Sequence, residues 1–269
     1  METIFINEGN LRDFQKQAVS KIIALGFFDG LHAGHRQVIA QAKKLAKQND
    51  QHFAVMSFTP HPKVVLSNGN VQVPQIMNFY EKQHQLEKLG VDTLYMIEFT
   101  KEFAALSPQQ FVKDYLLDLK VVHVVAGFDF TYGQKGHGNL DRMVDDAKGQ
   151  LSVTKVKKVV FAGEKISSSC IRAKLINGEV DMMPFLLGDF YETTSHWNGV
   201  ELIPSTECLV PGNGKYSVVI TNGKKRLQTE VIIKDGQYLC PYRIPPSFIG
   251  NVRLKWKKQI YAEQAVQSN

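Results

Sequence analysis

The sequence predicts an α/β fold with a parallel sheet, followed by a smaller domain of antiparallel strands. Through the first two thirds of the chain, short apolar runs alternate with amphipathic stretches of helical spacing. This alternation is typical of a parallel sheet covered by helices. After Gly188 the pattern changes to short β-rich runs between Gly and Pro clusters, as in a small antiparallel barrel or sandwich. The length of 269 residues suits two domains, since one domain holds roughly 100–200 residues.

Apolar runs predict the strands, and apolar residues at helical spacing predict the helices between them. In the first part, strands are expected at 22–26, 52–58, 93–97, 121–126 and 151–156. Helices are expected at 34–48, 78–89, 107–117, 139–148 and 169–177, with a last one ending near 187. In the second part, strands are expected at 216–221, 226–233 and 251–257. The two domains are therefore expected to be residues 1–187 and 188–269.

Composition and charge favour a soluble protein of a reducing compartment. Apolar residues make up 43% of the chain and charged residues 22%, which is ordinary for a globular protein. The net charge of +6 is spread evenly along the chain, so no nucleic-acid partner is expected. Neither a signal peptide nor an apolar run of the roughly 20 residues that cross a bilayer is present, so no membrane is expected. Three widely spaced cysteines suggest no disulfide framework and fit the cytoplasm. The oligomeric state is left open.

The first motif, GFFDGLHAGH at residues 26–35, joins the first predicted strand to the first helix. Its glycines allow a tight turn and a close approach of backbone to a ligand. The helix N-terminus offers free N–H groups and a positive dipole end, which suit a phosphate. His32 and His35 can converge on the same oxygens. Their spacing also permits zinc, but no thiol or carboxylate is evident to complete such a site.

The second motif, SFTPHP at residues 57–62, follows the second predicted strand. Its two prolines restrict the backbone and reduce the entropy lost on ordering the loop. Phe58 and His61 offer faces for a planar ring.

The third motif, GFDFTYG at residues 127–133, follows another apolar strand and is expected at the same sheet edge. Phe128 and Phe130 flank Asp129. Such an arrangement can hold an aromatic ring between apolar faces and bind its polar edge.

The fourth motif, ISSSCIR at residues 166–172, opens a helix. Serines at this position are ordinary helix caps, but their hydroxyls and the N–H groups can also hold a phosphate. The arginine, one turn into the helix, can neutralise developing charge.

In this order, the four motifs resemble those of the prokaryotic riboflavin kinase/FAD synthetase family, within the nucleotidylyltransferase superfamily. The first is similar to the family's GNFDGVHxGH, the second to TFxPHP, the third to GxDFxFG and the fourth to the superfamily's ISSTxIR. Phe27 stands where the family usually has Asn, which puts the bracing of the loop in doubt. Ser169 replaces Thr but keeps the hydroxyl, and Cys170 replaces a common Arg.

The resemblance implies a Rossmann-like nucleotidylyltransferase domain that joins AMP from ATP to FMN, giving FAD and pyrophosphate. Mg²⁺ would accompany ATP with few protein ligands, so no metal site of the protein's own is expected. His32, His35 and Arg172 would be catalytic. The residues implied for ATP are Gly26, Phe27, Phe28, Asp29, Gly30, His32, His35, Ser168, Ser169 and Arg172. The residues implied for FMN are Phe58, Pro60, His61, Phe128, Asp129 and Phe130.

The C-terminal third resembles the family's riboflavin kinase barrel in outline but lacks its chemistry. The kinase's GFPTAN element, whose Thr and Asn hold Mg-ATP, is here LIPSTE at residues 202–207, in which only Pro204 matches in place and Ser205 is a partial substitute. Only residues 236–247 separate the last strands, so the segment with the kinase's catalytic Glu is missing. The linker LGRPY is altered to LGDFY. The kinase activity is therefore expected to be lost, because phosphoryl transfer depends on positioned cations and donors.

Two other hypotheses remain. The chain could be a related nucleotidylyltransferase for another phosphorylated acceptor, against which the second and third motifs argue. It could instead be a non-catalytic flavin- or RNA-binding regulator, which the altered barrel and the net charge would suit but the two intact histidines oppose.

Overall fold

The computed structural model describes residues 1–262, which form two compact units. The first unit consists of Met1–Val73 and Phe79–Val159. The second takes in the short segment Pro74–Asn78 and the chain from Val160 onward. The main division between the units falls between Val159 and Val160, whereas the domain boundary was expected near residue 188. The domain boundary itself stays a prediction.

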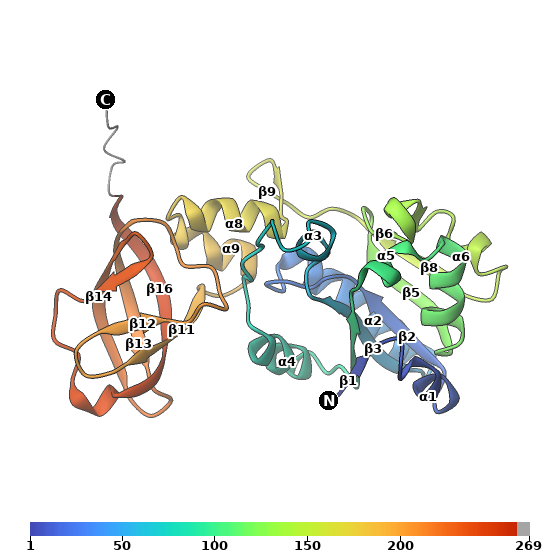
Figure 1. The fold of residues 1–269 in the computed structure, drawn as a ribbon, viewed down its shortest axis with the longest axis horizontal. Coiled ribbons are helices and arrows are strands. Elements are labelled where there is room, and N and C mark those ends of the chain that lie inside the picture. The colour runs from blue at the N-terminus through green and yellow to red at the C-terminus, as the bar shows by residue number, and fades with distance from the viewer. Residues whose placement is uncertain (263–269) are drawn as a thin grey trace. The chain divides into compact units, whose positions relative to one another are not determined.

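A six-stranded parallel sheet forms the centre of the first unit (Figure 1). Its strand order is β1-β4-β3-β2-β5-β8. The strands are β1 (Glu2–Ile6), β2 (Lys21–Leu25), β3 (His52–Thr59), β4 (Thr93–Glu98), β5 (Val121–Gly127) and β8 (Ser152–Val156). The sheet confirms the Rossmann-like prediction and all five expected strands. The edge strand β1 was not predicted, because its short run ETIFI has no clear periodicity.

Helices connect these strands. They are α1 (Leu11–Lys16), α2 (Ala33–Gln48), α3 (Pro62–Leu66), α4 (Phe79–Lys88), α5 (Lys101–Ala105), α6 (Pro108–Phe111), which continues as the π-helical turn η1 (Val112–Leu117), and α7 (Met143–Asp146). Of these, α2, α4 and α6 with η1 lie close to the expected positions, whereas α1, α3 and α5 were not predicted. The 3₁₀ turn η2 (Gln134–Gly136) lies between the short paired strands β6 (Thr131–Tyr132) and β7 (Gly138–Asn139). Helix α2 packs over β2, β3 and β5. Its buried residues share one face, as the helical spacing predicted: Val38, Ile39, Ala42 and Ala46.

The helix expected at residues 139–148 is wrong in extent, because only the single turn α7 forms. The side-chain oxygen of Asn139 accepts hydrogen bonds from the N–H groups of Asp141 (3.0 Å) and Arg142 (3.2 Å). This local turn replaces the start of the expected helix, since a short polar side chain competes with helical hydrogen bonding.

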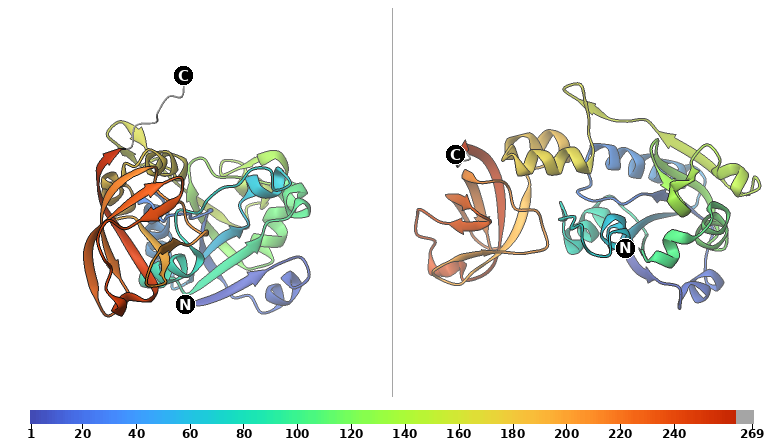
Figure 2. Two further views of the ribbon diagram at one scale, coloured as in Figure 1. Left: turned by 60° about the vertical axis from the view of Figure 1, so that its left-hand side comes forward. Right: turned by 45° about the horizontal axis from the view of Figure 1, so that its top comes forward.

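The second unit contains two helical segments and a closed antiparallel barrel (Figure 2). The helical part holds a two-stranded hairpin, β9 (Val160–Phe161) and β10 (Glu164–Lys165), then α8 (Ser168–Ile176), η3 (Val180–Met182) and α9 (Met183–Leu187). The barrel strands are β11 (Glu192–Trp197), β12 (Leu202–Pro204), β13 (Gly214–Thr221), β14 (Arg226–Lys234), β15 (Gln237–Leu239) and β16 (Gly250–Ala262), with the turn η4 (Pro246–Phe248) before the last. The strand order β11-β12-β15-β14-β13-β16 closes where β16 pairs with β11. Of the two architectures expected for this part of the chain, a barrel or a sandwich, the structure therefore has the barrel.

Trp256 forms the centre of the barrel core. Its side chain is fully buried, and its indole N–H donates to Thr193 Oγ1 at 3.0 Å. The rings of Tyr216 and Tyr238 meet it edge-on, with centroids at 5.4 and 5.6 Å. Buried aromatic rings of this kind contribute both apolar area and specific geometry. The barrel therefore has a complete core of its own.

Lys21, at the start of β2, is an unusual buried cation. Its side chain is 1% exposed, and Nζ donates to the carbonyl oxygen of Leu119 at 2.6 Å. Nζ also lies 5.5 Å from the centre of the Tyr95 ring. Burial lowers the pKa of Lys21 to about 8, because the charged form loses its hydration.

We expect the stability difference between the wild type and Lys21→Met to depend on pH. Between about pH 8 and 10.5 the unfolded lysine binds a proton that the folded one has released. The free energy of unfolding of the wild type should therefore rise relative to that of the variant over this interval, by up to about 3 kcal/mol. Urea unfolding of both proteins at pH 7.5 and near pH 10 checks this. A difference that does not change with pH would contradict the lowered pKa.

Candidate active site

The sheet topology has a switch point at β2. From β2 the chain builds the sheet outward through β3 and β4, then returns to add β5 on the other side of β2. Open α/β sheets bind ligands at such a switch point, outside the carboxyl ends of the strands. Leu25, the last residue of β2, pairs with Met56 of β3 and with Ala126 of β5. The segments that leave these three strands therefore begin at one edge.

Three of the four sequence motifs lie at this edge. Residues 26–35 follow β2, residues 57–62 span the end of β3, and residues 127–133 begin at the end of β5. The GFFDGLHAGH loop is thus flanked on one side by SFTPHP and on the other by GFDFTYG. This confirms that the three motifs share one sheet edge.

The loop after β2 has a strained backbone that is anchored by buried side chains. Phe28, Gly30 and Leu31 have positive φ angles of 51°, 80° and 43°. Such angles are unfavourable for non-glycine residues and persist only where the surroundings impose them. The side chains of Phe28 and Leu31 are 1% and 0% exposed, so core packing holds the loop in this shape. Strain of this kind is typical of ligand-binding loops.

The two histidines form a stacked pair at the N-terminus of α2. His32 is the N-cap residue, and its Nδ1 accepts a hydrogen bond from the backbone N–H of His35 at 3.3 Å. The two rings are nearly parallel, with centroids 3.6 Å apart. A Cβ on Gly34 would lie 3.1 Å from the His32 ring, so glycine leaves room for it. The spacing H-x-G-H therefore brings both imidazoles to the helix end.

His35 has an unusual environment. The edge of its ring meets the ring of Phe28, with centroids 5.2 Å apart, and its buried Nδ1 has no hydrogen-bond partner. Burial lowers the pKa of His35 well below its ordinary value, and the nearby His32 and Lys82 lower it further. The imidazole is therefore neutral at pH 7. A buried nitrogen without a partner fits a site that a polar ligand completes.

The loop is tied to β3 and α4 through one carbonyl group. The oxygen of Phe27 accepts hydrogen bonds from Ser57 Oγ at 2.7 Å and from Lys82 Nζ at 3.3 Å. The sequence analysis did not single out Lys82 as a site residue, although its position on the helix could have indicated one. It is four residues before the buried Leu86, so a lysine occupies the apolar face of α4. Asp29, 2% exposed, lies close enough to raise the pKa of Lys82, which burial lowers.

The SFTPHP segment contacts the first loop through His61. The His61 ring meets the Phe27 ring edge-on at 4.6 Å, and its Nδ1 caps α3 by accepting from the N–H of Lys63 at 3.1 Å. Pro60, after a cis peptide bond, is exposed. Phe58 is 8% exposed and belongs to the core cluster below the sheet edge. Its predicted contact with FMN stays a prediction.

In the GFDFTYG segment, the residues after β5 separate into exposed and packed positions. Phe128 is 40% exposed, and Asp129 is also exposed. Phe130 instead stacks on Tyr132, with centroids 6.3 Å apart, and packs against the core. The N–H of Phe128 donates to Val156 of β8 at 3.0 Å, which holds the start of the segment to the sheet.

The ISSSCIR segment lies in the second compact unit. Ser167 is the N-cap of α8, and its Oγ accepts from the N–H of Cys170 at 3.2 Å. Ser168 and Ser169 are the first two residues of the helix. Arg172 Nε donates to the carbonyl oxygen of Pro74 at 2.9 Å. The approach of this motif to the histidine pair stays a prediction.

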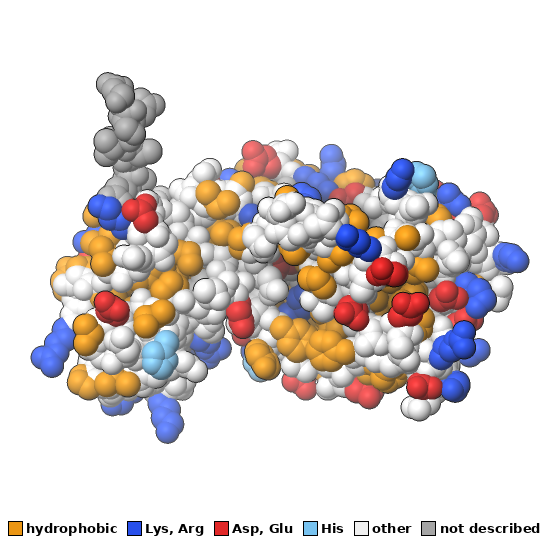
Figure 3. Space-filling model, viewed as in Figure 1, with side chains coloured by type: hydrophobic (Ala, Val, Ile, Leu, Met, Phe, Trp, Pro, Cys, Tyr) orange, Lys and Arg blue, Asp and Glu red, His pale blue; other side chains and the backbone are white. Residues whose placement is uncertain are grey.

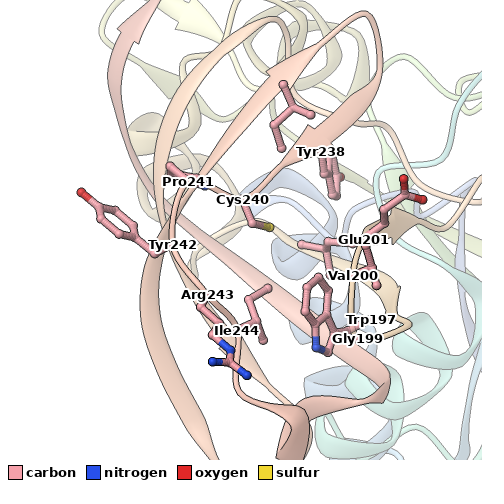
Figure 4. Close-up of a pocket in the computed structure, with 12 residues that line it drawn as sticks. Trp197, Gly199, Val200, Glu201, Tyr238, Cys240, Pro241, Tyr242, Arg243 and Ile244 are labelled. Atoms are coloured by element: carbon pink, nitrogen blue, oxygen red, sulfur yellow. The ribbon is translucent and has the colours of Figure 1, made fainter.

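A hollow lies in the barrel, with a volume of about 410 Å³ (Figure 4). Its walls come from the β11–β12 turn and from the segment that follows β15. The lining residues are Trp197, Gly199, Val200, Glu201, Leu202, Tyr238, Leu239, Cys240, Pro241, Tyr242, Arg243 and Ile244. None of the site residues predicted from the sequence lines it.

Within residues 1–262, no group of three or more His, Cys, Asp or Glu side chains is placed to hold a metal ion. No helix in the described part of the chain is both long and apolar enough to cross a membrane. Basic and acidic side chains are interspersed on the face shown in Figure 3.

Comparisons with known proteins agree with the motifs. The profile of the FAD synthetase family matches residues 14–170. A bifunctional riboflavin kinase/FMN adenylyltransferase of Listeria monocytogenes is 38% identical over 98% of this chain and 87% of its own length. One of Bacillus subtilis is 44% identical, over 71% of this chain and 60% of its own length. An FAD synthetase of L. monocytogenes is 30% identical over 82% of this chain and 91% of its own length.

Among solved structures, the chain is similar to the crystal structure of a macrolide-efflux protein from Streptococcus pneumoniae. The TM-score is 0.83 at 25% identity, and the match covers all of this chain and 94% of that one. Both units thus have a counterpart in one solved chain. Since the family profile spans more than half of the sequence and the L. monocytogenes relative nearly all of it, the chain belongs to the FAD synthetase family.

Proposed function

We propose that this protein transfers AMP from ATP to FMN, releasing FAD and pyrophosphate. In this reaction an oxygen of the FMN phosphate attacks the α-phosphorus of ATP. The bond from that phosphorus to the bridging oxygen of the β-phosphate breaks, and pyrophosphate leaves with the electron pair. No redox change occurs. Both reactants are polyanions, so alignment and charge neutralisation are the main demands on the protein.

The observation that carries the proposal is the position of the histidine pair. His32 and His35 lie at the N-terminus of α2, beside the switch point of the sheet. The partial positive charge of that helix end favours a phosphate there. A neutral His35 can donate one ring N–H to a phosphate oxygen as charge develops on it. These features support phosphate chemistry at this edge.

The flanking segments support an aromatic acceptor. The half-exposed ring of Phe128 and the exposed carboxylate of Asp129 lie on the β5 side, and Pro60 and His61 lie on the β3 side. A flavin needs an apolar face for its ring and polar groups for its edge, and these segments offer both. We assign FMN to them and ATP to the GFFDGLHAGH loop. A different phosphorylated acceptor remains the alternative, and a binding screen of FMN against other such acceptors decides between them.

We assign Ser168, Ser169 and Arg172 to the outer phosphates of ATP. The first two open α8, a helix of nine residues, with hydroxyl and N–H groups at its start. The guanidinium can bind phosphate oxygens in a bidentate manner. Mg²⁺ accompanying ATP would screen the phosphate charges, with few protein ligands. The three widely spaced cysteines suit a reducing compartment, and we place the enzyme in the cytoplasm.

We further propose that the barrel does not phosphorylate riboflavin. The LIPSTE segment begins with β12 and lacks the Thr-Asn pair of the kinase pattern. Between β15 and β16 the chain has room only for Cys240–Ile249, with one 3₁₀ turn at Pro246–Phe248. No glutamate occurs in this stretch to act as a base.

We expect purified protein with Mg-ATP to convert FMN to FAD but to leave riboflavin unchanged. The two flavins are offered separately, and products are separated by chromatography. The FMN reaction shows that the preparation is active, so it serves as the control for the riboflavin reaction. Rapid formation of FMN from riboflavin would contradict the proposed loss of the kinase. Absence of FAD would contradict the transferase itself.

We expect His35→Ala to lower kcat at least about 100-fold, because one donor to the developing charge is lost. The matched control is His84→Ala, which removes an exposed histidine of α4. Steady-state turnover of FMN and ATP is measured for both variants. Near-normal turnover of His35→Ala refutes its assigned role.

We expect Phe128→Ala to raise the KM for FMN about tenfold and to leave the KM for ATP unchanged. A lost stacking contact with a planar ring costs about 1.4 kcal/mol, which is a factor of ten in affinity. Tyr80→Ala is the control, since Tyr80 is an aromatic residue 75% exposed on α4. Equal changes in both KM values would place Phe128 outside the flavin site.

A further inference from the structure

Lys82, on α4, is a buried lysine that contacts the GFFDGLHAGH loop. None of the four motifs includes it. Its side chain is 7% exposed. Nζ lies 3.3 Å from the carbonyl oxygen of Phe27 and 5.4 Å from the centre of the Phe27 ring. The ammonium group of Lys82 thus contacts the loop between β2 and α2 at Phe27.

Packing alone does not account for a lysine at this position. Burying an ammonium group costs several kcal/mol unless it is paired, and an apolar residue would fill the same face of α4. The carbonyl that Lys82 contacts already has a donor, since Ser57 Oγ binds it at 2.7 Å. Asp29 supplies the opposite charge: it is 2% exposed and counteracts the lowering of the Lys82 pKa by burial. The lysine therefore brings a positive charge to the loop, opposite the buried carboxylate of Asp29.

The charge acts on His35. His35 is affected electrostatically by His32, on its own helix, and by Lys82, on α4, while Asp29 in the loop faces Lys82. A nearby cation disfavours a second positive charge, so Lys82 helps to keep the imidazole neutral. The same cation favours polyanionic substrates at the loop.

We propose that Lys82 is a positioning residue of the adenylyl transfer site, which fixes the loop through the Phe27 carbonyl and places a cationic side chain beside His35. The inference rests on the proposed function, because it assigns the loop to ATP. Lys82 acts through the loop and through His35, without touching the reacting atoms. Three substitutions separate its two contributions. Lys82→Met removes both the hydrogen bond and the charge, Lys82→Gln keeps a donor without the charge, and Lys82→Arg keeps both.

The chain also provides a matched control. Lys21 is buried to a similar degree and likewise donates to a backbone carbonyl, but it lies at the amino end of β2, at the other edge of the sheet. Lys21→Met therefore reports what the loss of a buried lysine does to stability alone. A merely structural Lys82 would behave in the same way.

The experiment combines kinetics with titration of His35. FAD formation is measured with FMN and Mg-ATP, and the imidazole of His35 is titrated by NMR, its signal being assigned by its absence from His35→Gln. We expect Lys82→Met to lower kcat/KM for ATP by about 10- to 100-fold, as displaced catalytic groups do. The His35 pKa should rise in Lys82→Met and in Lys82→Gln. Lys82→Arg should retain most of the activity and the wild-type His35 pKa, and Lys21→Met should change neither.

Two results would overturn the inference: kcat/KM for Lys82→Met within about twofold of that for Lys21→Met, or a His35 pKa that is the same with and without the Lys82 charge. If Lys82→Met does not fold, as judged by circular dichroism, Lys82→Gln decides by the same two measurements. An inactive wild type would instead contradict the proposed transferase. In that case the titration of His35 in Lys82→Gln still tests the electrostatic contribution of Lys82.

Discussion

The parallel pairing of β2 with both β3 and β5 is the constraint on which the site depends. Because parallel strands end at one edge, this pairing brings together three loops that are separated by up to about a hundred residues in the chain. The order of the strands also places a topological switch point there, since the chain leaves β2 on one side and returns on the other. No single loop would make a site for two polyanions.

In the loop after β2, an unfavourable backbone conformation is stabilised by side-chain packing. Its backbone takes positive φ angles at two non-glycine residues, which is unfavourable, while the buried side chains of Phe28 and Leu31 hold it in place. The stacked histidines lie where the loop joins the N-terminus of α2. The carbonyl oxygen of Phe27 in the loop accepts hydrogen bonds from Ser57 and Lys82. A loop fixed in this way needs little reorganisation when substrate binds, which is how a preorganised site lowers a barrier.

The barrel is closed although two of its segments differ from the kinase pattern. Its closure depends on alternating inward side chains and on the core around Trp256, none of which belongs to the altered kinase segments. Loops and strand ends carry activity, while the strand interiors carry stability. The segments that differ from the kinase pattern are the β12 end and the β15–β16 connection, which lie at a strand end and in a loop.

The sequence by itself determined the fold class, most of the elements of the first unit and three motifs at one sheet edge, because apolar periodicity and glycine-rich turns are local properties. It overestimated the helix at 139–148, since it did not show that the Asn139 side chain would form a competing turn. It also missed the edge strand β1, the barrel strand β11 and the short strands β12 and β15, whose pairing depends on distant partners. Only the tertiary structure decided the separation of Phe128 from the packed Phe130, and the place of Lys82 beneath the loop. The physical reason is that burial and charge proximity arise between elements far apart in the chain, where no local pattern records them.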